Sequence, residues 1–115
     1  MHPTQIEIDS QQFKLNLSAI RQQIGAQVKF CLPVKANAYG HGLAVAVDAL
    51  EEADGFALLS IEDAIQLREA GCRKPILLLE GVFGPDDYMQ CAIYQFTPVI
   101  HSSVQLDWLA NSFLP

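Results

Sequence analysis

Positively charged residues are scarce in this sequence of 115 residues. Lysine and arginine number 7 against 13 aspartate and glutamate residues, which gives a formal net charge of −6. A protein that binds nucleic acid or an anionic membrane surface normally presents a basic face. The charge balance therefore argues against binding to nucleic acid or to a membrane surface. Backbone N–H groups remain able to bind a phosphate locally.

Cysteine pairs and long apolar segments are missing as well. Cys31, Cys72 and Cys91 lie far apart and form no C-x-x-C motif, so no metal site is expected. No apolar run approaches the roughly 20 residues of a membrane-spanning helix. Residues 1–10 also lack the basic and apolar regions of a signal peptide. These absences predict a protein of a reducing compartment, most simply the cytoplasm.

The sequence does contain an alternating series of strand-like and helix-like segments. Short apolar or alternating runs predict strands, and apolar residues that recur every three or four positions predict helices. The predicted strands are residues 4–9, 28–34, 55–60, 75–81 and 96–100. The predicted helices are residues 10–24, 43–53, 61–70, 86–95 and 104–113. Neither a repeat at the residue level nor a linker interrupts the series.

Residues at the helix ends support these boundaries. Gly25 ends the first predicted helix, as glycine often does. Ser60 with Asp63, and Ser102 with Gln105, have the spacing of a capping box, in which a serine oxygen and a side chain three residues later satisfy free N–H groups. Two later helices are therefore expected to begin after these serines.

The strand–helix unit recurs roughly four times, which predicts an α/β protein with parallel strands. The run at residues 75–81 is almost entirely apolar, which is typical of a parallel strand covered on both faces. Two architectures fit this pattern: an open, doubly wound sheet, and part of a (β/α)8 barrel. A complete barrel needs about 250 residues, so the chain is long enough for about half of one.

The segment CLPVKANAYGHGL, residues 31–43, places Lys35 at the end of a predicted strand. Ligand sites in α/β folds lie at the carboxyl ends of parallel strands. Partial burial would lower the pKa of a lysine there, so that its free amine could attack a carbonyl group. Tyr39 offers a phenol for a phosphate oxygen, and Gly40 and Gly42 let backbone N–H groups approach an anion. The alternative is a solvated lysine after a strand, with Tyr39 packed on the core.

The stretch VKANAYGHG closely resembles the pyridoxal-phosphate (PLP) attachment motif of the alanine racemase family. Two more segments are similar to the same enzymes in the same order: IEIDSQQFKLNLSAIR before the motif, and IEDAIQLREAG followed by KPILLLEG after it. The resemblance covers essentially the whole chain. It implies the N-terminal part of a (β/α)8 TIM-type barrel over residues 1–115, with the C-terminal β-rich domain of the family absent.

The resemblance also implies roles for particular residues. Lys35 matches the lysine that forms a Schiff base with PLP and serves as the base for one face of the substrate. Tyr39 matches the tyrosine that hydrogen-bonds the cofactor phosphate. Leu79 falls where the family has an apolar residue near the cofactor, although an ordinary barrel-core leucine is an equally good interpretation. Pro33 departs from the family's usual aliphatic residue, and a proline cannot donate a hydrogen bond to a sheet.

The implied activity is the PLP-dependent interconversion of L-alanine and D-alanine, an isomerase reaction that supplies a peptidoglycan precursor. The family enzyme is a homodimer, and its second base is a tyrosine from the partner subunit's C-terminal domain. Neither Tyr88 nor Tyr94 lies in a matching motif, so little or no activity is expected of this chain alone. Three alternatives remain: a racemase for another amino acid, a non-catalytic PLP-binding barrel module, and a structural α/β unit without a ligand.

Overall fold

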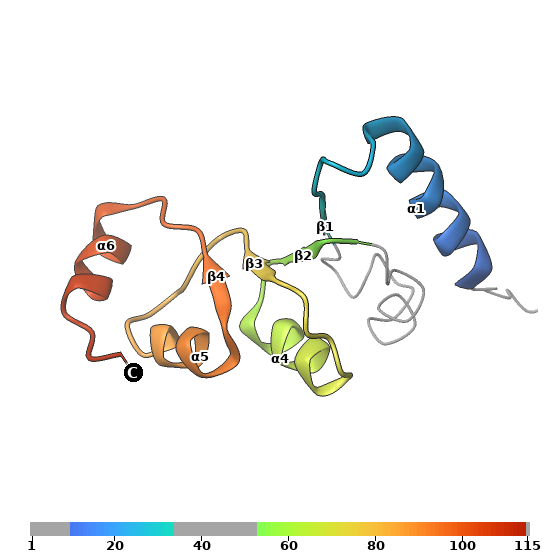
Figure 1. Cartoon of the computed structure of the whole chain (residues 1–115). Coiled ribbons are helices and arrows are strands. Elements are labelled where there is room, and N and C mark those ends of the chain that lie inside the picture. The colour runs from blue at the N-terminus through green and yellow to red at the C-terminus, as the bar shows by residue number, and fades with distance from the viewer. Residues whose placement is uncertain (1–9, 34–52, 115) are drawn as a thin grey trace, which may run out of the picture.

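The computed structural model describes residues 10–33 and 53–114 of the chain (Figure 1). Its elements are α1 (Ser10–Ile24), β1 (Cys31–Pro33), β2 (Gly55–Leu58), α4 (Ile61–Glu69), β3 (Ile76–Leu78), α5 (Asp87–Tyr94), β4 (Phe96–Pro98) and α6 (Ser103–Ala110). The expected elements within the described residues are all present, although the strands and α6 are shorter than predicted. The predicted strand at 4–9 and nearly all of the predicted helix at 43–53 lie outside the described residues.

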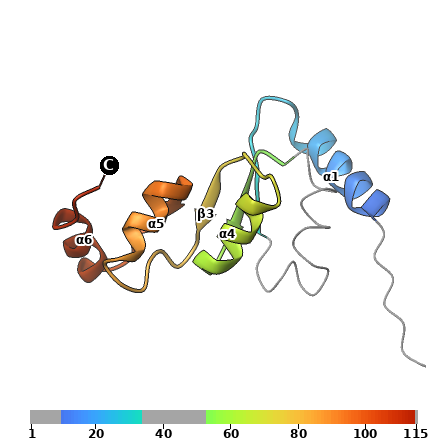
Figure 2. The same cartoon turned by 90° about the horizontal axis from the view of Figure 1, so that it is seen from below.

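The four described strands form one parallel sheet in the order β1-β2-β3-β4. Each strand therefore pairs with its predecessor in the sequence. Figures 1 and 2 show α4 and α5, which connect β2 to β3 and β3 to β4, side by side along the sheet. A doubly wound sheet reverses its strand order at a switch point and carries helices on both faces. The consecutive order supports the barrel alternative instead, and the sequence prediction of an α/β fold is confirmed.

One face of the sheet carries the hydrophobic core. Phe56 and Leu58 of β2 lie in register with Ile76 and Leu78 of β3, and none of the four is more than 1% exposed. They pack with buried residues of α4 and α5 in a single cluster. The helix residues of this cluster include Ala64, Leu67, Tyr88 and Cys91. Burial of this apolar surface is the main force that holds the helices against the sheet.

The opposite face of the sheet is less completely covered in the described part of the chain. Ala57, Leu77 and Thr97 lie in register on this face. Ala57 is buried, Leu77 is half-buried and Thr97 is exposed. The prediction that residues 75–81 are covered on both faces therefore holds for the helix-facing side and only partly for the other.

Both predicted serine caps are present. Ser60 Oγ accepts a hydrogen bond from the backbone N–H of Asp63 at 3.0 Å, and Ser102 Oγ accepts one from Gln105 at 3.2 Å. In a capping box the Gln105 side chain would accept from the N–H of Ser102, and the structure differs in this bond. Gln105 Oε1 accepts from the N–H of His101, one residue before the serine, at 2.8 Å. The Gln105 side chain is buried and reaches beyond its own helix.

The two strand prolines lie on the outer strands of the described sheet. Pro33 is the last residue of β1 and pairs with Ala57, and Pro98 is the last residue of β4 and pairs with Leu78. Each of these strands has a single hydrogen-bonded neighbour among the described strands. A proline is tolerated in such places because its missing N–H breaks no ladder on the open side.

Arg68 ties the amino-terminal edge of the sheet together. Its Nε donates to the backbone oxygen of Tyr94 at 2.8 Å, and its Nη2 donates to that of Gln95 at 3.1 Å, both at the end of α5. Its Nη1 donates to the oxygens of Cys72 at 3.2 Å and Lys74 at 2.6 Å, in the connection that leads into β3. A single guanidinium thus satisfies carbonyl groups that a helix end and a loop would otherwise leave unpaired.

An ion pair and a hydrogen bond at the same edge join α1 to the starts of β1 and β2. Arg21 Nη2 donates to Asp54 Oδ2 at 2.8 Å, and the same oxygen accepts from the N–H of Phe30 at 2.8 Å. The Arg21 guanidinium also lies over the Phe30 ring, 4.5 Å from its centroid. The Arg21 hydrogen bond, assisted by the one from Phe30, lowers the pKa of the Asp54 carboxyl group.

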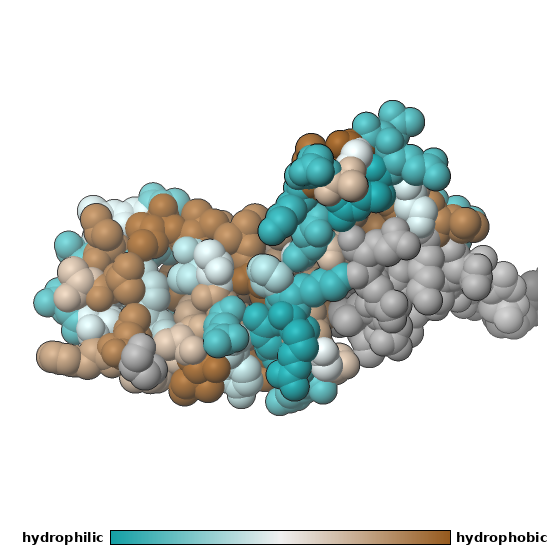
Figure 3. Space-filling model, in the orientation of Figure 1, coloured by the Kyte–Doolittle hydropathy of each residue, from teal (hydrophilic) through white to brown (hydrophobic). Residues whose placement is uncertain are grey.

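Apolar side chains are exposed mainly at the end of the molecule that carries α5 and α6. Figure 3 shows brown, hydrophobic atoms gathered there, whereas the surface of α4 is largely hydrophilic. The exposed apolar residues in this region include Met89, Ile93, Val104, Leu106 and Phe113. Patches of this kind favour association between protein surfaces.

The ion pair and hydrogen bond that Asp54 accepts predict a pH-dependent contribution to stability. The native pKa of Asp54 is lowered, so its stabilising effect is complete above the unfolded value of about 4 and is lost as the pH falls through the lower native pKa. We expect Asp54→Asn to lower the melting temperature at pH 7 and to have a smaller effect at pH 3. Thermal unfolding followed by circular dichroism measures this difference. The exposed Asp107→Asn variant is the control, and an equal effect of Asp54→Asn at both pH values would contradict the prediction.

Candidate functional site

The sequence predicts a site at the carboxyl ends of the strands. Lys35 and Tyr39, its two principal residues, lie outside the described residues. Leu79, its third residue, directly follows β3 at this edge, and its N–H donates to the backbone oxygen of Leu58 at 2.8 Å. The structure thus positions one of the three predicted site residues and describes the edge of the sheet beside it.

Leu79 belongs to a row of apolar side chains that crosses this edge. The register pairs Leu58 with Leu78 and Leu78 with Pro98. The hydrogen bonds from Leu79 N to Leu58 O and from Val99 N to Leu78 O, at 2.8 and 3.0 Å, extend it by one residue. We call Leu59, Leu79 and Val99 the carboxyl-edge row. Because side chains alternate along a strand, the row lies on the sheet face opposite the helix-packed core. All three residues are half-buried.

A hydrogen-bond network lies next to this row and centres on Gln105. Its Nε2 donates to the backbone oxygens of Glu80 at 3.1 Å and Val82 at 3.0 Å. Its Oε1 accepts from the His101 N–H, and its backbone oxygen accepts from the Tyr88 hydroxyl at 2.8 Å. The network joins the loop after β3, the turn after β4 and helix α5.

His101 completes the network from the exposed side. Its Nε2 lies 2.9 Å from the backbone oxygen of Glu80. A carbonyl oxygen only accepts, so His101 carries a proton on Nε2 and donates it. The 3.2 Å approach between His101 Nε2 and Gln105 Nε2 is then a contact between two donors that share the Glu80 oxygen. The loop carbonyl after β3 is therefore held by two side chains from the α6 region.

Gly81 allows the loop after β3 to approach the turn after β4. Its φ is +73°, a left-handed conformation that residues with a Cβ rarely adopt. A Cβ at this position would overlap the backbone oxygen of Val99 and lie 2.9 Å from Gln105 Nε2. Glycine is thus required here both by the backbone angle and by the space.

Buried ionisable groups in this region are neutral at physiological pH. Burial raises the pKa of the Cys91 thiol to about 11 and also raises the pKa of the Tyr88 phenol. A thiol with so high a pKa is not a nucleophile at pH 7. No group of histidine, cysteine and acidic residues within the described ranges could hold a metal ion. Cys91 and Tyr88 pack in the hydrophobic core, and the Tyr88 hydroxyl adds a hydrogen bond to Gln105.

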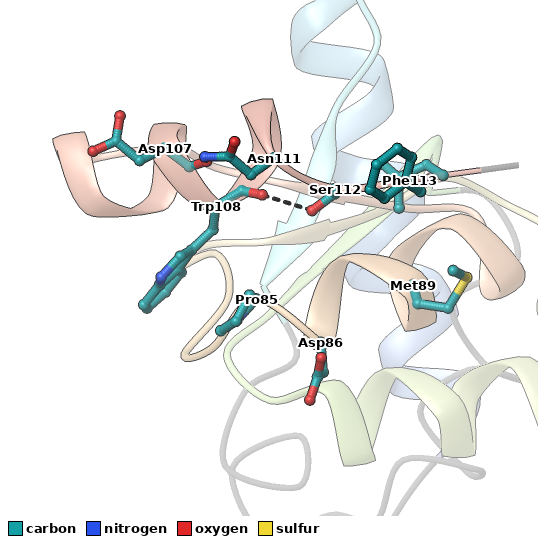
Figure 4. A pocket seen from close by; sticks show the side chains of 9 residues that line it. Pro85, Asp86, Met89, Asp107, Trp108, Asn111, Ser112 and Phe113 are labelled. Carbon is teal, nitrogen blue, oxygen red and sulfur yellow. Dashed lines mark hydrogen bonds between the residues drawn. The ribbon is translucent and has the colours of Figure 1, made fainter.

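A hollow of about 400 Å³ lies between the start of α5 and the end of α6. Figure 4 shows its lining, which includes Pro85 and Met89 on one side and Trp108 and Phe113 on the other. No residue of the carboxyl-edge row lines it. Its charged lining residues are Asp86 and Asp107, which would repel an anionic group such as a phosphate. The hollow therefore does not include the carboxyl-edge row.

Four parallel strands in sequential order, alternating with helices, form an α/β arrangement that fits part of a (β/α)8 barrel. The sequence profile "Alanine racemase, N-terminal domain" matches residues 8–113. The chain belongs to this family. The predicted resemblance and the predicted barrel fold are thereby confirmed.

Individual relatives agree with the profile. The chain is 44% identical to an alanine racemase of Acinetobacter baumannii over 113 residues, which are 98% of this chain and 30% of that protein. It is also 44% identical to the catabolic alanine racemase of Salmonella typhimurium over 112 residues, 97% of this chain and 31% of that one. The chain thus spans less than a third of the length of these curated relatives.

A solved structure is similar in three dimensions. The structure of alanine racemase from Acinetobacter baumannii superposes with a TM-score of 0.82 and 36% sequence identity, covering 90% of this chain and 30% of that one. The described sheet and helices therefore resemble a part of the alanine racemase fold. None of the described helices is long and apolar enough to cross a membrane.

The described residues fit a PLP-type cofactor in one respect. The carboxyl-edge row presents three half-buried aliphatic side chains at the strand ends, and an aromatic ring needs such an apolar surface against its face. The residues expected to bind the cofactor chemically, Lys35 and Tyr39, lie outside the described part.

The sequence named Leu79, whose role at a cofactor stays a prediction, and its interpretation missed the network beside this residue. The Ser102–Gln105 spacing was a visible signal, but it was interpreted as a helix cap only. The contacts from Gln105 to residues 80 and 82 span more than twenty positions. Sequence spacing carries no information about such a distant partner, so the network could be recognised only in the folded structure.

Gly81 provides a test of this close approach. We expect Gly81→Ala to reduce the free energy of unfolding by roughly 2–4 kcal/mol, because the added Cβ meets backbone atoms at an unfavourable φ. Denaturation in urea measures the loss. Gly84→Ala, in the same loop but with nothing within 4 Å of the added carbon, should change stability by less than about 1 kcal/mol. Equal effects of the two substitutions would refute the explanation.

Proposed function

We propose that the chain supplies the cofactor-binding part of a PLP-dependent alanine racemase, which interconverts L- and D-alanine in the cytoplasm as a homodimer and provides D-alanine for peptidoglycan. Membership of the alanine racemase N-terminal domain family is the observation that carries this proposal. The relatives named above are alanine racemases, and that favours alanine over other amino acids as the substrate.

Lys35 is the proposed attachment residue and the base for one face of the substrate. It follows Pro33, the last described residue of β1, by two positions in the sequence, and Pro33 pairs with Ala57 of β2. The support for this role is the stretch VKANAYGHG around Lys35, which resembles the PLP attachment motif of the family.

The proposed chemistry divides between the cofactor and the chain. The bound cofactor supplies an electron sink that makes the substrate Cα–H acidic. The amine of Lys35 removes or returns the proton on one face of Cα, Tyr39 holds the phosphate, and Leu79 supports the ring. Inversion needs a second proton donor on the opposite face, and the family assigns that role to a residue beyond this chain.

The attachment of PLP to Lys35 can be measured directly. We expect the purified chain, mixed with PLP and reduced with borohydride, to carry a covalent PLP adduct on the peptide that contains Lys35. Lys35→Ala should lose this adduct because it removes the amine of the proposed attachment residue. Peptide mass mapping locates the modification.

Lys29→Ala is the matched control, since this exposed lysine precedes the same strand; it should leave the Lys35 adduct intact. Labelling spread evenly over surface lysines, in a chain shown by circular dichroism to be folded, would contradict the proposed site.

The chain alone should turn over L-alanine very slowly or not at all. The physical reason is that one base can exchange a proton only on its own face of Cα. A coupled assay for D-alanine with the purified chain tests this expectation. Turnover that persists through repeated purification and disappears in Lys35→Ala would show that a second proton donor lies within these 115 residues.

A further inference from the structure

Gln105 is the one buried polar side chain in the described part of the chain, with 4% of its surface exposed. All its polar atoms are hydrogen-bonded: the backbone N to Ser102, the backbone O to Tyr88, Oε1 to His101, and Nε2 to Glu80 and Val82. An unpaired amide in the interior would cost on the order of 1–3 kcal/mol, so a fully bonded amide fixes one arrangement of its neighbours.

The bonds of Gln105 converge on the two segments that follow β3 and β4. Nε2 holds the carbonyls of Glu80 and Val82, on either side of the tight Gly81 turn. Oε1 holds the N–H of His101, two residues after Val99. Leu79 directly precedes the first of these anchored groups. The network therefore holds backbone groups one residue after Leu79 and two residues after Val99, whereas the N–H groups of Leu79 and Val99 themselves bond within the sheet.

A helix cap alone does not account for this arrangement. The N-terminal end of α6 is already satisfied by Ser102 Oγ, which accepts from Gln105 N. Capping does not require Nε2 to reach across to the loop after β3, nor does it require Gly81 to pack against Val99. The extra bonds serve the geometry of the strand ends rather than the helix.

We propose that Gln105 is a positioning residue for the cofactor: its side-chain amide locks the loop after β3 to the turn after β4 and so fixes the carboxyl-edge row against which the PLP ring rests. This inference rests on the proposed function, because it gives the row a ligand. Gln105 itself does not touch the cofactor and acts through Leu79 and Val99.

The test compares Gln105→Met with Gln66→Met in the 115-residue chain. Methionine matches the length of glutamine and removes its donors and acceptor. Gln66 is an exposed residue of α4, so its replacement is the control. Titration with PLP, followed by the absorbance of the lysine adduct, should give a dissociation constant on the order of tenfold higher for Gln105→Met. Gln66→Met should bind as the unmodified chain does.

Hydrogen exchange read by mass spectrometry gives the second measurement. We expect faster exchange in Gln105→Met for peptides covering 79–83 and 99–103, and unchanged exchange in the 56–67 region. If Gln105→Met does not fold, Gln105→Glu replaces it. That variant keeps the acceptor for His101 and removes both donors to the β3 loop.

The outcomes separate the two proposals. Weaker PLP binding together with faster local exchange supports the positioning role. Faster exchange with unchanged affinity overturns it, because the network would then hold the loop without affecting the cofactor. Unchanged exchange overturns it as well. If the unmodified chain forms no adduct at Lys35, the proposed function fails for this chain, and the exchange measurement alone then decides whether Gln105 fixes the strand ends.

Discussion

Side chains alternate between the two faces of a parallel sheet, and the rest of the described structure depends on this alternation. Phe56, Leu58, Ile76 and Leu78 must all face the helices, because no other arrangement buries four large apolar side chains together. Once they do, the intervening residues necessarily face the other way. The carboxyl-edge row is therefore a consequence of core packing, and a one-residue change of register would turn it toward the helices.

The two edges of the sheet are held by different chemistry. At the amino-terminal edge, Arg21, Asp54 and Arg68 tie helix ends and loops together through charged hydrogen bonds. At the carboxyl edge, the buried, neutral amide of Gln105 holds the loop after β3 by donating hydrogen bonds to its carbonyl groups. This division agrees with barrel enzymes in general, where the amino-terminal side serves stability and the carboxyl side carries the ligand. A neutral, fully bonded amide holds the loops without adding a charge at this edge.

The carboxyl edge also requires the backbones of the loops after β3 and β4 to approach each other closely. Gly81 adopts a positive φ and lies against the backbone of Val99, so the loops after β3 and β4 touch with no side chain between them. The hydroxyl of the buried Tyr88 reaches the Gln105 backbone from α5. The same helix that packs on the core therefore also supports the strand ends, and core stability and site geometry are coupled through one residue.

The sequence by itself determined the α/β class, the order of the described elements, the serine caps at Ser60 and Ser102, and the family, because these depend on local periodicity, capping chemistry and a contiguous motif around Lys35. The pattern of strands and helices alone fitted both a barrel and a doubly wound sheet, and the family resemblance implied the barrel. The sequence interpreted Gln105 only as part of a helix cap. Tertiary structure added the sequential strand order, which agrees with the barrel, and the contacts of Gln105. Strand order and the contacts between Gln105 and residues 80 and 82 join positions twenty or more residues apart, and only packing of the folded chain brings such positions together.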